Sequence, residues 1–502
     1  MTDARRPALV AAVYLGTFIA ALDVSIVSVA LPAIQTALHT DIAGLQWVVG
    51  AYALCLSAFM LSAGPIGDRY GRKLSWLIGV AVFMVGSAIC AVAPTLGVLI
   101  AGCAVQGVAG AFLIPGSLSI LTQAFPDPVQ RAHVIGGWSS FSAISLIIGP
   151  ILGGILVDSA GWPSIFLINL PIGAITIGLG VWGIRETAHP DHAALDPAGQ
   201  ALSVLWLGAL TYGLIAAGQQ GWTAPGTIAA LTVALAAFIV FMIIESRTRR
   251  PLLPLQLFGN ARFAVINLAS FVLGFSGYSS LFFFSLFLQQ AQGWSATETG
   301  WCMAPQFVAM AIVASVFGRL AARYDVRTLM ITGYGMIGVA MLAMSEFQPD
   351  TPYSLIALLF AVLGIGMGLA VPATSAAVMA SVPRERSGMA SATMNALRQA
   401  GMTLGIALLG TLMSARAMTL LATGLEAAGI ADAKTMAVVA INRHQVTTVG
   451  SLDSAAFGTL FSTAFAGGFH VAMVYAGLPG VMAAVLLAAV KSHRTNPGTD
   501  HR

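Results

Sequence analysis

The chain has 502 residues, of which 58% are hydrophobic and only 8% are charged. A soluble protein carries roughly a quarter of charged residues, so this composition excludes a soluble globular protein and predicts a polytopic membrane protein. The net charge of +4 is small, and the placement of the basic residues therefore carries more information than their number. The four cysteines lie in or beside apolar segments without metal-ligand spacing, which predicts packing residues, no disulfides and no metal site.

The first apolar segment, Leu9 to Pro32, is long enough to cross a bilayer and contains one acid, Asp23. A charge among so many apolar side chains is expensive, because neither water nor a bulk dielectric surrounds it. We therefore expect Asp23 to be paired, to face a wet cavity, or to spend much of its time protonated. It is the first candidate for ion coupling, because no other apolar segment has an acid in its middle. The alternative is that Asp23 only ties helices together by hydrogen bonds.

Apolar windows of about 20 residues predict fourteen membrane-spanning helices, since backbone polar groups in lipid must be satisfied within their own segment. These windows lie near residues 9–32, 45–65, 74–93, 97–121, 134–157, 164–184, 199–217, 226–245, 263–288, 300–318, 328–345, 354–377, 395–415 and 466–490. Most Lys and Arg residues fall in loops and tails on one side, and the short loops on the other side contain none. By the positive-inside rule, this split predicts an even number of spans with both termini in the cytoplasm.

The seventh and eighth spans lie between two charged connectors, 185–198 and 246–262. We interpret these spans as a helical pair inserted between two six-helix halves. The predicted domains are an N-terminal six-helix bundle (1–190), two inserted helices with linkers (191–262) and a C-terminal six-helix bundle (263–502). The last bundle contains a long external loop, 416–463, whose apolar run at 436–441 suggests an amphipathic helix or hairpin.

Two internal loops have related sequences, GPIGDRYGRK (Gly64–Lys73) after span two and GRLAARYDVR (Gly318–Arg327) after span ten. A basic turn that recurs at matching positions is typical of transporters built from duplicated halves. In the first turn, glycine allows a tight bend, and Asp68 can pair with Arg69, Arg72 or the N-terminus of a neighbouring helix. The alternative is an ordinary basic cytoplasmic loop.

The first of these turns resembles the Gly-x-x-x-Asp-Arg-x-Gly-Arg-Lys/Arg motif of the major facilitator superfamily. Further stretches resemble its fourteen-helix drug:proton antiporters of EmrB/QacA type: ALDVSIVSVALP in span one, SLIIGPILGG in span five, GWPSIFLINLPIG in span six and NALRQAGMTLGIALLG in span thirteen. The resemblance covers nearly the whole chain and is weakest over 416–463. It implies an all-α major facilitator fold with two six-helix bundles plus two inserted helices.

The resemblance also implies roles for two elements. In the family, the basic turn latches the two halves together in the outward-open state, a role that falls here on Gly64, Asp68, Arg69, Gly71, Arg72 and Lys73. The Gly-Pro-x-x-Gly-Gly element of the antiporters implies a hinge formed by Gly149, Pro150, Gly153 and Gly154. Small residues and proline also permit close packing and bending, so ordinary helix packing is the alternative for this element.

One departure from the family concerns span four, where the pattern Arg-x-x-Gln-Gly is replaced by Cys103-Ala-Val-Gln106-Gly107. Position 103 and Asp23 should lie at similar depth, because a helix rises about 1.5 Å per residue and both are a short distance below the outer ends of their spans. An arginine at position 103 is a natural partner for the acid. Without that cation, we expect Asp23 to bind a proton more readily than in relatives.

The second half contains candidates for a substrate cavity. Phe271, Phe275, Tyr278 and Phe282 share one face of span nine by helical spacing, either as packing residues or as a surface for flat lipophilic or cationic compounds. Arg398 in span thirteen either snorkels to the cytoplasm or has a gating or substrate role. The predicted substrate cavity comprises Gln106, Phe275, Tyr278, Phe282 and Arg398.

Together these features predict a proton-coupled antiporter of the inner membrane that exports small amphipathic or cationic compounds by alternating access, which is multidrug efflux. Asp23 would take a proton from outside, weaken the hold on the substrate and release the proton inside. We expect no cofactor beyond the proton as coupling ion. The expected partners are a small-molecule substrate and the lipid bilayer, with no nucleic acid, and the protein is expected to act as a monomer or with a separate periplasmic adaptor.

Three other functions are alternatives to this one. An exporter of the same fold dedicated to one endogenous metabolite or antibiotic is the main alternative. An ATP-driven pump or membrane-bound enzyme is disfavoured, because the sequence contains no Gly-x-x-x-x-Gly-Lys-Ser/Thr loop and no His/Glu metal constellation. A channel or sensor is disfavoured by the antiporter-type Gly/Pro element.

Overall fold

The computed structural model describes residues 5–187, 196–248, 252–253, 255–383, 386–443 and 453–489. Within these residues, 14 helices are long and apolar enough to cross a membrane, and there is no strand. The predicted all-α fold with fourteen spans is therefore confirmed. The predicted connectors 185–198 and 246–262 and the stretch 416–463 lie partly outside the described residues, as do basic residues of the C-terminal tail.

The first half of the chain forms six spans. They are α1 (Arg5–Ala37), α2 (Ile42–Tyr70), α3 (Arg72–Ala91), α4 (Leu96–Ala124), α5 (Pro128–Ala160) and the short α6 (Ser164–Leu167) continued by α7 (Asn169–Gly183). Polar residues mark several helix starts, because their side chains accept hydrogen bonds from backbone N–H groups that have no partner within the helix. Asp41, Thr95 and Asp127 do so at the starts of α2, α4 and α5. These caps set where each apolar segment begins to be helical.

The inserted pair and the second half follow. The pair consists of α8 (Pro197–Gln220) and α9 (Pro225–Arg247), followed by the short α10 (Leu255–Phe258). The second half consists of α11 (Ala261–Val272), η2 (Leu273–Tyr278), α12 (Ser280–Leu286), η3 (Phe287–Ala291), α13 (Ala296–Arg323), α14 (Val326–Met344), α15 (Tyr353–Ala380), α16 (Ser387–Ala427), α17 (Ala433–Arg443) and α18 (Ser454–Ala489). The elements from α11 to η3 form one continuous span, Ala261–Ala291.

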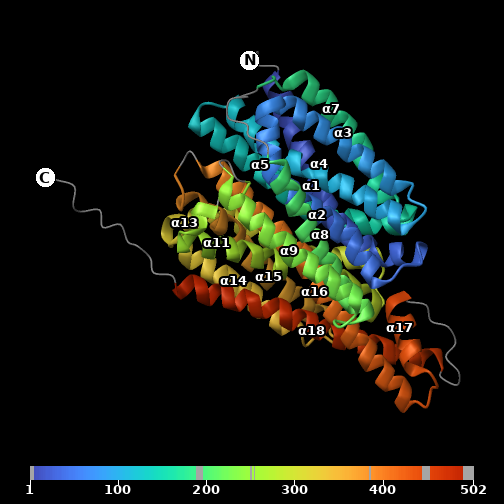
Figure 1. Cartoon of the computed structure of the whole chain (residues 1–502). Coiled ribbons are helices and arrows are strands. Elements are labelled where there is room, and N and C mark those ends of the chain that lie inside the picture. Colours follow the sequence, from blue (N-terminus) through green and yellow to red (C-terminus); the bar gives the residue numbers. More distant parts are fainter. Residues whose placement is uncertain are drawn as a thin grey trace.

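The two halves meet along two helix pairs. Helix α2 packs along α16, and α5 packs along α13. Figure 1 shows α1 to α7, in blue to green, on one side of this boundary and α13 to α18, in yellow to red, on the other. The inserted helices α8 and α9 pack against each other, and α8 contacts both α2 and α16. The inserted pair therefore touches both halves at one of their shared boundaries.

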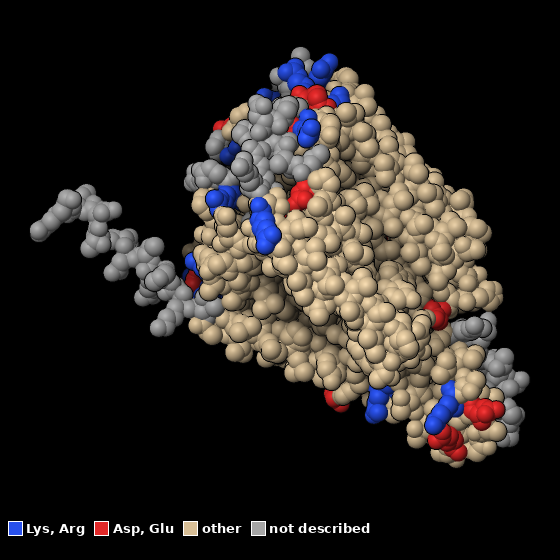
Figure 2. Space-filling view, viewed as in Figure 1, with Lys and Arg blue, Asp and Glu red and all other residues tan. Residues whose placement is uncertain are grey.

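Burial separates the inner spans from those that face lipid. In the most apolar window of span Ala261–Ala291, 83% of residues are buried, whereas in that of α9 only 22% are. The span from α11 to η3 is thus enclosed by protein, and α9 exposes most of its apolar surface. Charged side chains gather toward the two ends of the visible face, and a broad band without charge lies between them (Figure 2). This is the distribution that a bilayer requires.

The end of the bundle where α1 begins is termed the near face, and the opposite end is termed the far face. Helices α16 and α18 extend beyond the other spans at the far face, where α17 also lies (Figure 1). The stretch 416–463 is therefore largely helical in its described part. Helix α17 contains the apolar run predicted to be amphipathic: Ala437 and Ile441 are buried, whereas Val438 and Val439 are exposed. Of the two structures expected here, an amphipathic helix or a hairpin, the described residues form a helix, and its exposed face includes apolar side chains.

The predicted aromatic face of span nine needs a correction. The segments Leu273–Tyr278 and Phe287–Ala291 are π-helical, and a π turn rotates all following residues relative to an α-helix. Spacing counted for a regular α-helix consequently fails after residue 273. Phe282 is only 2% exposed and packs edge-on against Phe283, with ring centroids 5.1 Å apart. It does not line a cavity in this conformation.

Candidate functional site

Asp23 lies in the far-face half of α1 and is only 3% exposed. Its carboxylate oxygen Oδ1 accepts hydrogen bonds from two neutral amides, Gln106 Nε2 at 3.1 Å and Asn169 Nδ2 at 3.2 Å. Among the described residues it forms no ion pair, since the ion pairs found there are Arg72–Asp68 and His470–Glu346. Asp23 is thus held by hydrogen bonds, and its partners are neutral.

The two amides share a second partner, the hydroxyl of Ser87 in α3. Gln106 Nε2 and Asn169 Nδ2 donate to Ser87 Oγ at 2.9 and 3.2 Å. The side-chain oxygen of Gln106 accepts a hydrogen bond from the Cys90 thiol at 3.6 Å. The side-chain oxygen of Asn169 is buried and has no hydrogen-bond partner among the described residues. The cluster around Asp23 therefore holds one unused acceptor, and its polar groups come from α1, α3, α4 and α7.

Sequence reasoning identified Asp23 and Gln106 but missed Asn169 and Ser87. Asn169 begins α7 directly after the short α6, and the break between these helices turns its side chain toward α1. Asn169 could have been found from the sequence, because it is an amide within an apolar segment, GWPSIFLINLPIG, that also resembles the family. Gln106 is 0% exposed, so its predicted place in a substrate cavity is corrected: in this conformation it holds Asp23.

Cys103 stands where the family has arginine, and it is linked to Asp23 through Cys90, whose thiol donates to Gln106, which in turn donates to Asp23. The sulfur of Cys103 lies 3.8 Å from that of Cys90, and both cysteines are free. The expectation that position 103 and Asp23 share one depth agrees with this placement. The expected effect on proton binding by Asp23 stays a prediction.

The basic turn Gly64–Lys73 connects α2 to α3 at the near face. Arg72 Nε lies 2.6 Å from Asp68 Oδ1, which is one of the pairings expected from the sequence. Lys73 Nζ donates to the carbonyl oxygen of Val181 at 2.7 Å, within the same half. The exposed Arg69 lies over the ring of its neighbour Tyr70. In this conformation the described hydrogen bonds of the turn stay within the first half, so its role as a latch between halves remains a prediction.

Glu186, just after α7, completes this turn and was missed by sequence reasoning. Its two carboxylate oxygens accept from the backbone N–H groups of Lys73 and Leu74, at 3.0 and 2.9 Å. These are the free N–H groups at the start of α3. Gly71 has a φ of 109°, and a Cβ there would lie 2.7 Å from the Glu186 carboxylate. Both conformation and space therefore require glycine at this position.

The Gly/Pro element of α5 contacts helices of both halves. On one side, Gly149 and Gly153 lie against Ser25 and Ile26 of α1, so closely that a Cβ on either glycine would overlap α1. On the other side, Gly154 lies against the backbone of Ala296 in α13. Small residues allow this approach. The element thus lies between the helix that carries Asp23 and the boundary with the second half.

Pro150 takes part in the same boundary. Its carbonyl oxygen lies against Gly300 of α13 so closely that a Cβ on Gly300 would overlap it. Nearby, the backbone N–H of Thr297 donates to Asp158 Oδ2 at 2.8 Å. These contacts join α5 and α13 toward the far face. Whether the element also acts as a hinge stays a prediction.

Further hydrogen bonds between the halves lie near the far face. Gln290 Nε2 donates to Gln35 Oε1 at 2.6 Å, and Gln35 Nε2 donates to the carbonyl oxygen of Asn442, the penultimate residue of α17, at 2.8 Å. Gln46 Nε2 donates to the carbonyl oxygen of Ile406 at 2.8 Å. The far face is therefore closed by amide side chains in this conformation.

In the second half, Arg398 of α16 and Tyr278 of η2 are brought together. The guanidinium lies 5.4 Å from the centre of the Tyr278 ring, and Nη2 donates to Asn395 Oδ1 at 2.5 Å. Both side chains are half-buried, as is Phe275, which stacks on Phe271 at 6.3 Å between ring centres. Of the five residues predicted to form the substrate cavity, Arg398, Tyr278 and Phe275 lie in one region of the second half.

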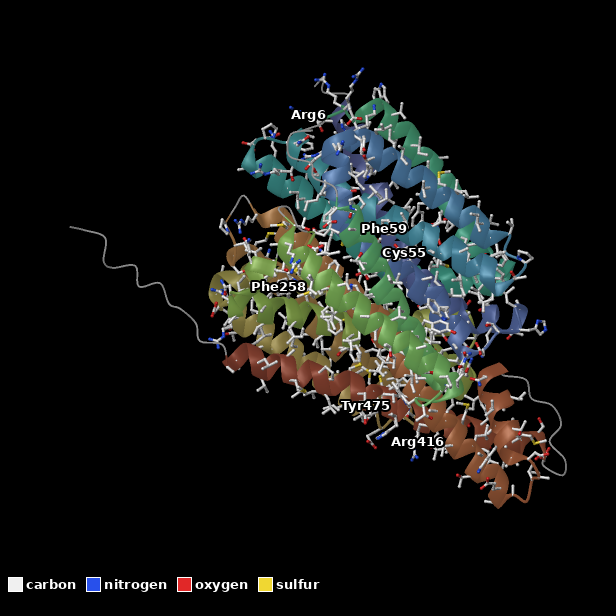
Figure 3. The ribbon with its side chains drawn as sticks, in the orientation of Figure 1. Arg6, Cys55, Phe59, Phe258, Arg416 and Tyr475 are labelled. Atoms are coloured by element: carbon white, nitrogen blue, oxygen red, sulfur yellow. The ribbon has the colours of Figure 1, made fainter. Side chains whose placement is uncertain are left out.

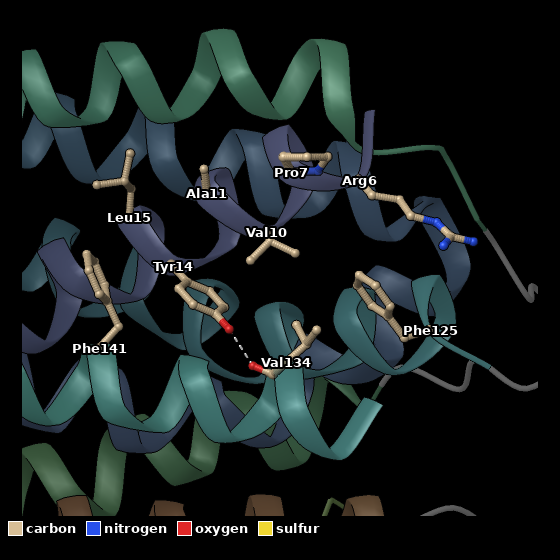
Figure 4. A pocket seen from close by; sticks show the side chains of 9 residues that line it. All are labelled: Arg6, Pro7, Val10, Ala11, Tyr14, Leu15, Phe125, Val134 and Phe141. Carbon is tan, nitrogen blue, oxygen red and sulfur yellow. Dashed lines mark hydrogen bonds between the residues drawn. The ribbon is translucent and has the colours of Figure 1, made fainter. Parts of the chain in front are cut away.

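An apolar groove of about 700 Å³ opens at the near face between α1, α4 and α5 (Figure 4). It is lined by Arg6, Pro7, Val10, Ala11, Tyr14, Leu15, Phe125, Val134 and Phe141. Tyr14 spans the groove and donates to the carbonyl oxygen of Val134 at 2.6 Å. None of the predicted cavity residues lines this groove. Arg6 lies at the near-face end of the molecule, far from Arg416 on the extension of α16 (Figure 3).

In the described part of the chain, fourteen apolar helices in two halves, with a buried acid inside the first half, define a multi-pass membrane protein of the transporter class. The sequence profile of the Major Facilitator Superfamily matches residues 13–248 and 266–447. The chain belongs to this superfamily, and the family predicted from its motifs is confirmed.

Curated relatives support the same assignment. The chain is 34% identical to the methylenomycin A resistance protein of Bacillus subtilis (strain 168), over 80% of this chain and 86% of the relative. It is 36% identical to the multidrug resistance protein Stp of Mycobacterium tuberculosis, over 82% and 77% of the two chains. It is 33% identical to the tetracenomycin C resistance and export protein of Streptomyces glaucescens, over 81% and 75%. The names of all three relatives refer to drug or antibiotic resistance.

Solved structures share the fold at low sequence identity. A bacterial homolog of the human lysosomal transporter Spinster matches with a TM-score of 0.64 at 19% identity, over 97% of both chains. An auto-inhibited peptide transporter of the POT family matches with a TM-score of 0.66 at 14% identity, over 99% of both chains. These likenesses concern the fold alone.

Proposed function

We propose that this protein is a proton-coupled antiporter that exports small amphipathic or cationic compounds by alternating access. The observation that carries the proposal is Asp23, a membrane-embedded carboxylate that is 3% exposed and held by the neutral amides of Gln106 and Asn169. A buried acid without a cationic partner can exist with or without its proton at modest cost, whereas a salt-bridged acid is held ionised. The proton is the proposed coupling ion, with no other cofactor and no catalytic step.

The surroundings of Asp23 suggest how its protonation reaches the rest of the molecule. Ser25 and Ile26, which follow Asp23 closely, lie against the glycines of α5, and the opposite side of α5 contacts α13 of the second half. A small shift of α1 is therefore transmitted to the boundary between the halves. Because both contacts are too tight for a Cβ, α5 has little freedom to absorb such a shift. This arrangement favours two discrete packings rather than continuous deformation.

In the proposed cycle, Asp23 takes up a proton when the far face is open. Loss of the carboxylate charge weakens its hydrogen bonds from Gln106 and Asn169, since a bond to an ionised acceptor is about twice as strong as one to a neutral acceptor. The halves then close at the far face and open at the near face, where Asp23 releases the proton and new substrate enters. The inward movement of the proton drives the outward movement of the substrate.

We further propose that the near face is cytoplasmic, with both termini inside the cell and the protein in the inner membrane. The support is the charge pattern of the loops: basic residues gather at the near face, and the short far-face loops contain none. The substrate is a small molecule that exchanges with the bilayer. We propose a monomer as the working unit, with any periplasmic adaptor being a separate chain.

The second candidate function is export of one endogenous metabolite or antibiotic. It is favoured by the names of two relatives, which each refer to a single antibiotic, methylenomycin A and tetracenomycin C. The name of a third refers to multidrug resistance. A panel of unrelated compounds separates the two candidates, because a dedicated exporter responds to few of them.

The test is substrate-driven proton movement in everted vesicles, with ethidium and quaternary ammonium compounds, for wild type and Asp23→Asn. We expect proton movement with several compounds in wild type and loss of coupling in Asp23→Asn. The exposed Asp350 at the far face offers a matched control, and Asp350→Asn should behave as wild type. Coupling that persists in Asp23→Asn would mean that the carrier lies elsewhere.

A further inference from the structure

We propose that Arg398 and Tyr278 form a recognition site for the acidic group of an aromatic substrate, such as a carboxylate or enolate attached to a flat conjugated ring. The inference rests on the proposed export function and names a substrate class for it. This class differs from the cationic compounds expected from the sequence.

The depth of Arg398 is the first argument. Its backbone lies against Gly274, which is near the middle of the span Ala261–Ala291. At this level α16 crosses η2 so closely that a Cβ on Gly274 would overlap the carbonyl oxygen of Arg398. The guanidinium is held within the span by Asn395 and by the ring of Tyr278. Snorkelling to the near face does not account for this placement.

The charge of Arg398 is the second argument. In the described part of the chain, no carboxylate lies within 4.0 Å of its guanidinium. Asn395 and Tyr278 are neutral, so the described residues place no counter-ion beside this positive charge. Asp23 is not its counter-ion, because the partners of Asp23 all belong to the first half. An unbalanced cation inside a membrane is costly, and an anionic ligand removes that cost.

The shape of the site is the third argument. A guanidinium has five N–H donors in a planar fork, and the described structure uses one nitrogen, Nη2, for the bond to Asn395. The remaining donors match the two oxygens of a carboxylate. The centre of the half-buried Tyr278 ring lies 5.4 Å from the guanidinium, and the rings of Phe271 and Phe275 stack on each other in the same span, which offers aromatic surface for a flat ring. The site therefore combines one anion-binding group with aromatic surface.

The test is direct binding to the purified full chain in detergent, with no proton gradient. The probes are 9-anthracenecarboxylate and its methyl ester, which share one fluorescent ring and differ in charge. We expect wild type to bind the acid about 10-fold or more tightly than the ester, since hydrogen bonds between charged groups contribute about 1.5–3 kcal/mol. Arg398→Gln should reduce this ratio to about 1, and Arg398→Lys, which keeps the charge without the fork, should give an intermediate ratio.

The control is Arg416→Gln, an exposed arginine on the far-face extension of the same helix (Figure 3), which should keep the wild-type ratio. Equal binding of acid and ester by wild type, or an unchanged ratio in Arg398→Gln, would overturn the proposal. If Arg398→Gln does not fold, the wild-type ratio and Arg398→Lys decide. Because binding is measured without a gradient, vesicles that move no protons would contradict the export function and leave the binding result standing.

Discussion

Asn169 at the start of α7 donates a hydrogen bond of 3.2 Å to the carboxylate of Asp23 in α1, and the same nitrogen lies 3.2 Å from Ser87 Oγ in α3. One amide thus ties together three helices of the first half at the acid proposed to carry the proton. Whether Asp23 holds or releases a proton depends on such neutral donors, because the described structure offers it no cation.

Removing this donor should change the pH dependence of transport. Asn169→Ala leaves the carboxylate with Gln106 as its remaining amide donor, which disfavours the ionised form. We therefore expect the pH profile of substrate-driven proton movement to shift toward higher pH. The exposed Gln348 at the far face provides the control, since Gln348→Ala removes an amide far from Asp23. A profile identical to wild type would show that Asn169 has only a packing role.

Adding a cation should have the opposite effect. Cys103→Arg adds a guanidinium to the cluster that holds Asp23, where it stabilises the carboxylate, so a lower pH is needed for proton uptake. We expect the pH profile to shift toward lower pH, opposite in direction to Asn169→Ala. Thermal unfolding should be measured in parallel, because Cys103 is only 2% exposed and the larger side chain needs space. A folded variant with an unmoved profile would contradict the proposed influence of position 103.

The contact between α5 and α13 should be sensitive to a single methyl group. In Gly300→Ala, the added Cβ would overlap the carbonyl oxygen of Pro150, so the helices must separate at the far face. We expect this conformation to be destabilised by about 1–3 kcal/mol, the usual cost of overpacking.

The reporter for this change is a cysteine at Gln289, whose amide donates to the carbonyl oxygen of Val29 across the boundary. Its reaction with an impermeant maleimide should be faster in Gly300→Ala than in the parent protein. Gly178→Ala is the control, because a Cβ there meets no atom within 4 Å. Equal labelling rates in the two glycine variants would argue against a closed contact at this point.

Glu186 should stabilise the start of α3. Glu186→Ala leaves the N–H groups of Lys73 and Leu74 without their side-chain partner, and loss of such a cap costs about 0.5–2 kcal/mol. We expect a lower midpoint of thermal unfolding in detergent and little change for Glu186→Gln, which keeps one acceptor oxygen. If both variants unfold at the wild-type temperature, water replaces the cap at no cost.

The number and type of the membrane spans followed from the sequence, because hydropathy is a local property and lipid leaves the helix as the available structure for a single segment. The same holds for Asp23, since an acid within an apolar run stands out by composition alone. The turn at Gly64–Lys73 and the element at Gly149–Gly154 stood out by their motifs. The run at 436–441 predicted a helix or a hairpin between α16 and α18, and the tertiary structure has a helix there.

Only the tertiary structure decided which side chains meet. Asn169 and Ser87 are separated by many residues from Asp23, and nothing in local spacing brings them to it. Gln106 was assigned to the cavity by its motif, but its amide is used by Asp23. Phe282 was expected on a cavity face by helical spacing, but it lies in a stretch that is buried on all sides, as its neighbours Phe283 and Phe284 show. Arg398 contacts Tyr278, which lies on another helix. The depth of a residue can be estimated from its own segment, whereas its partners depend on how the segments pack.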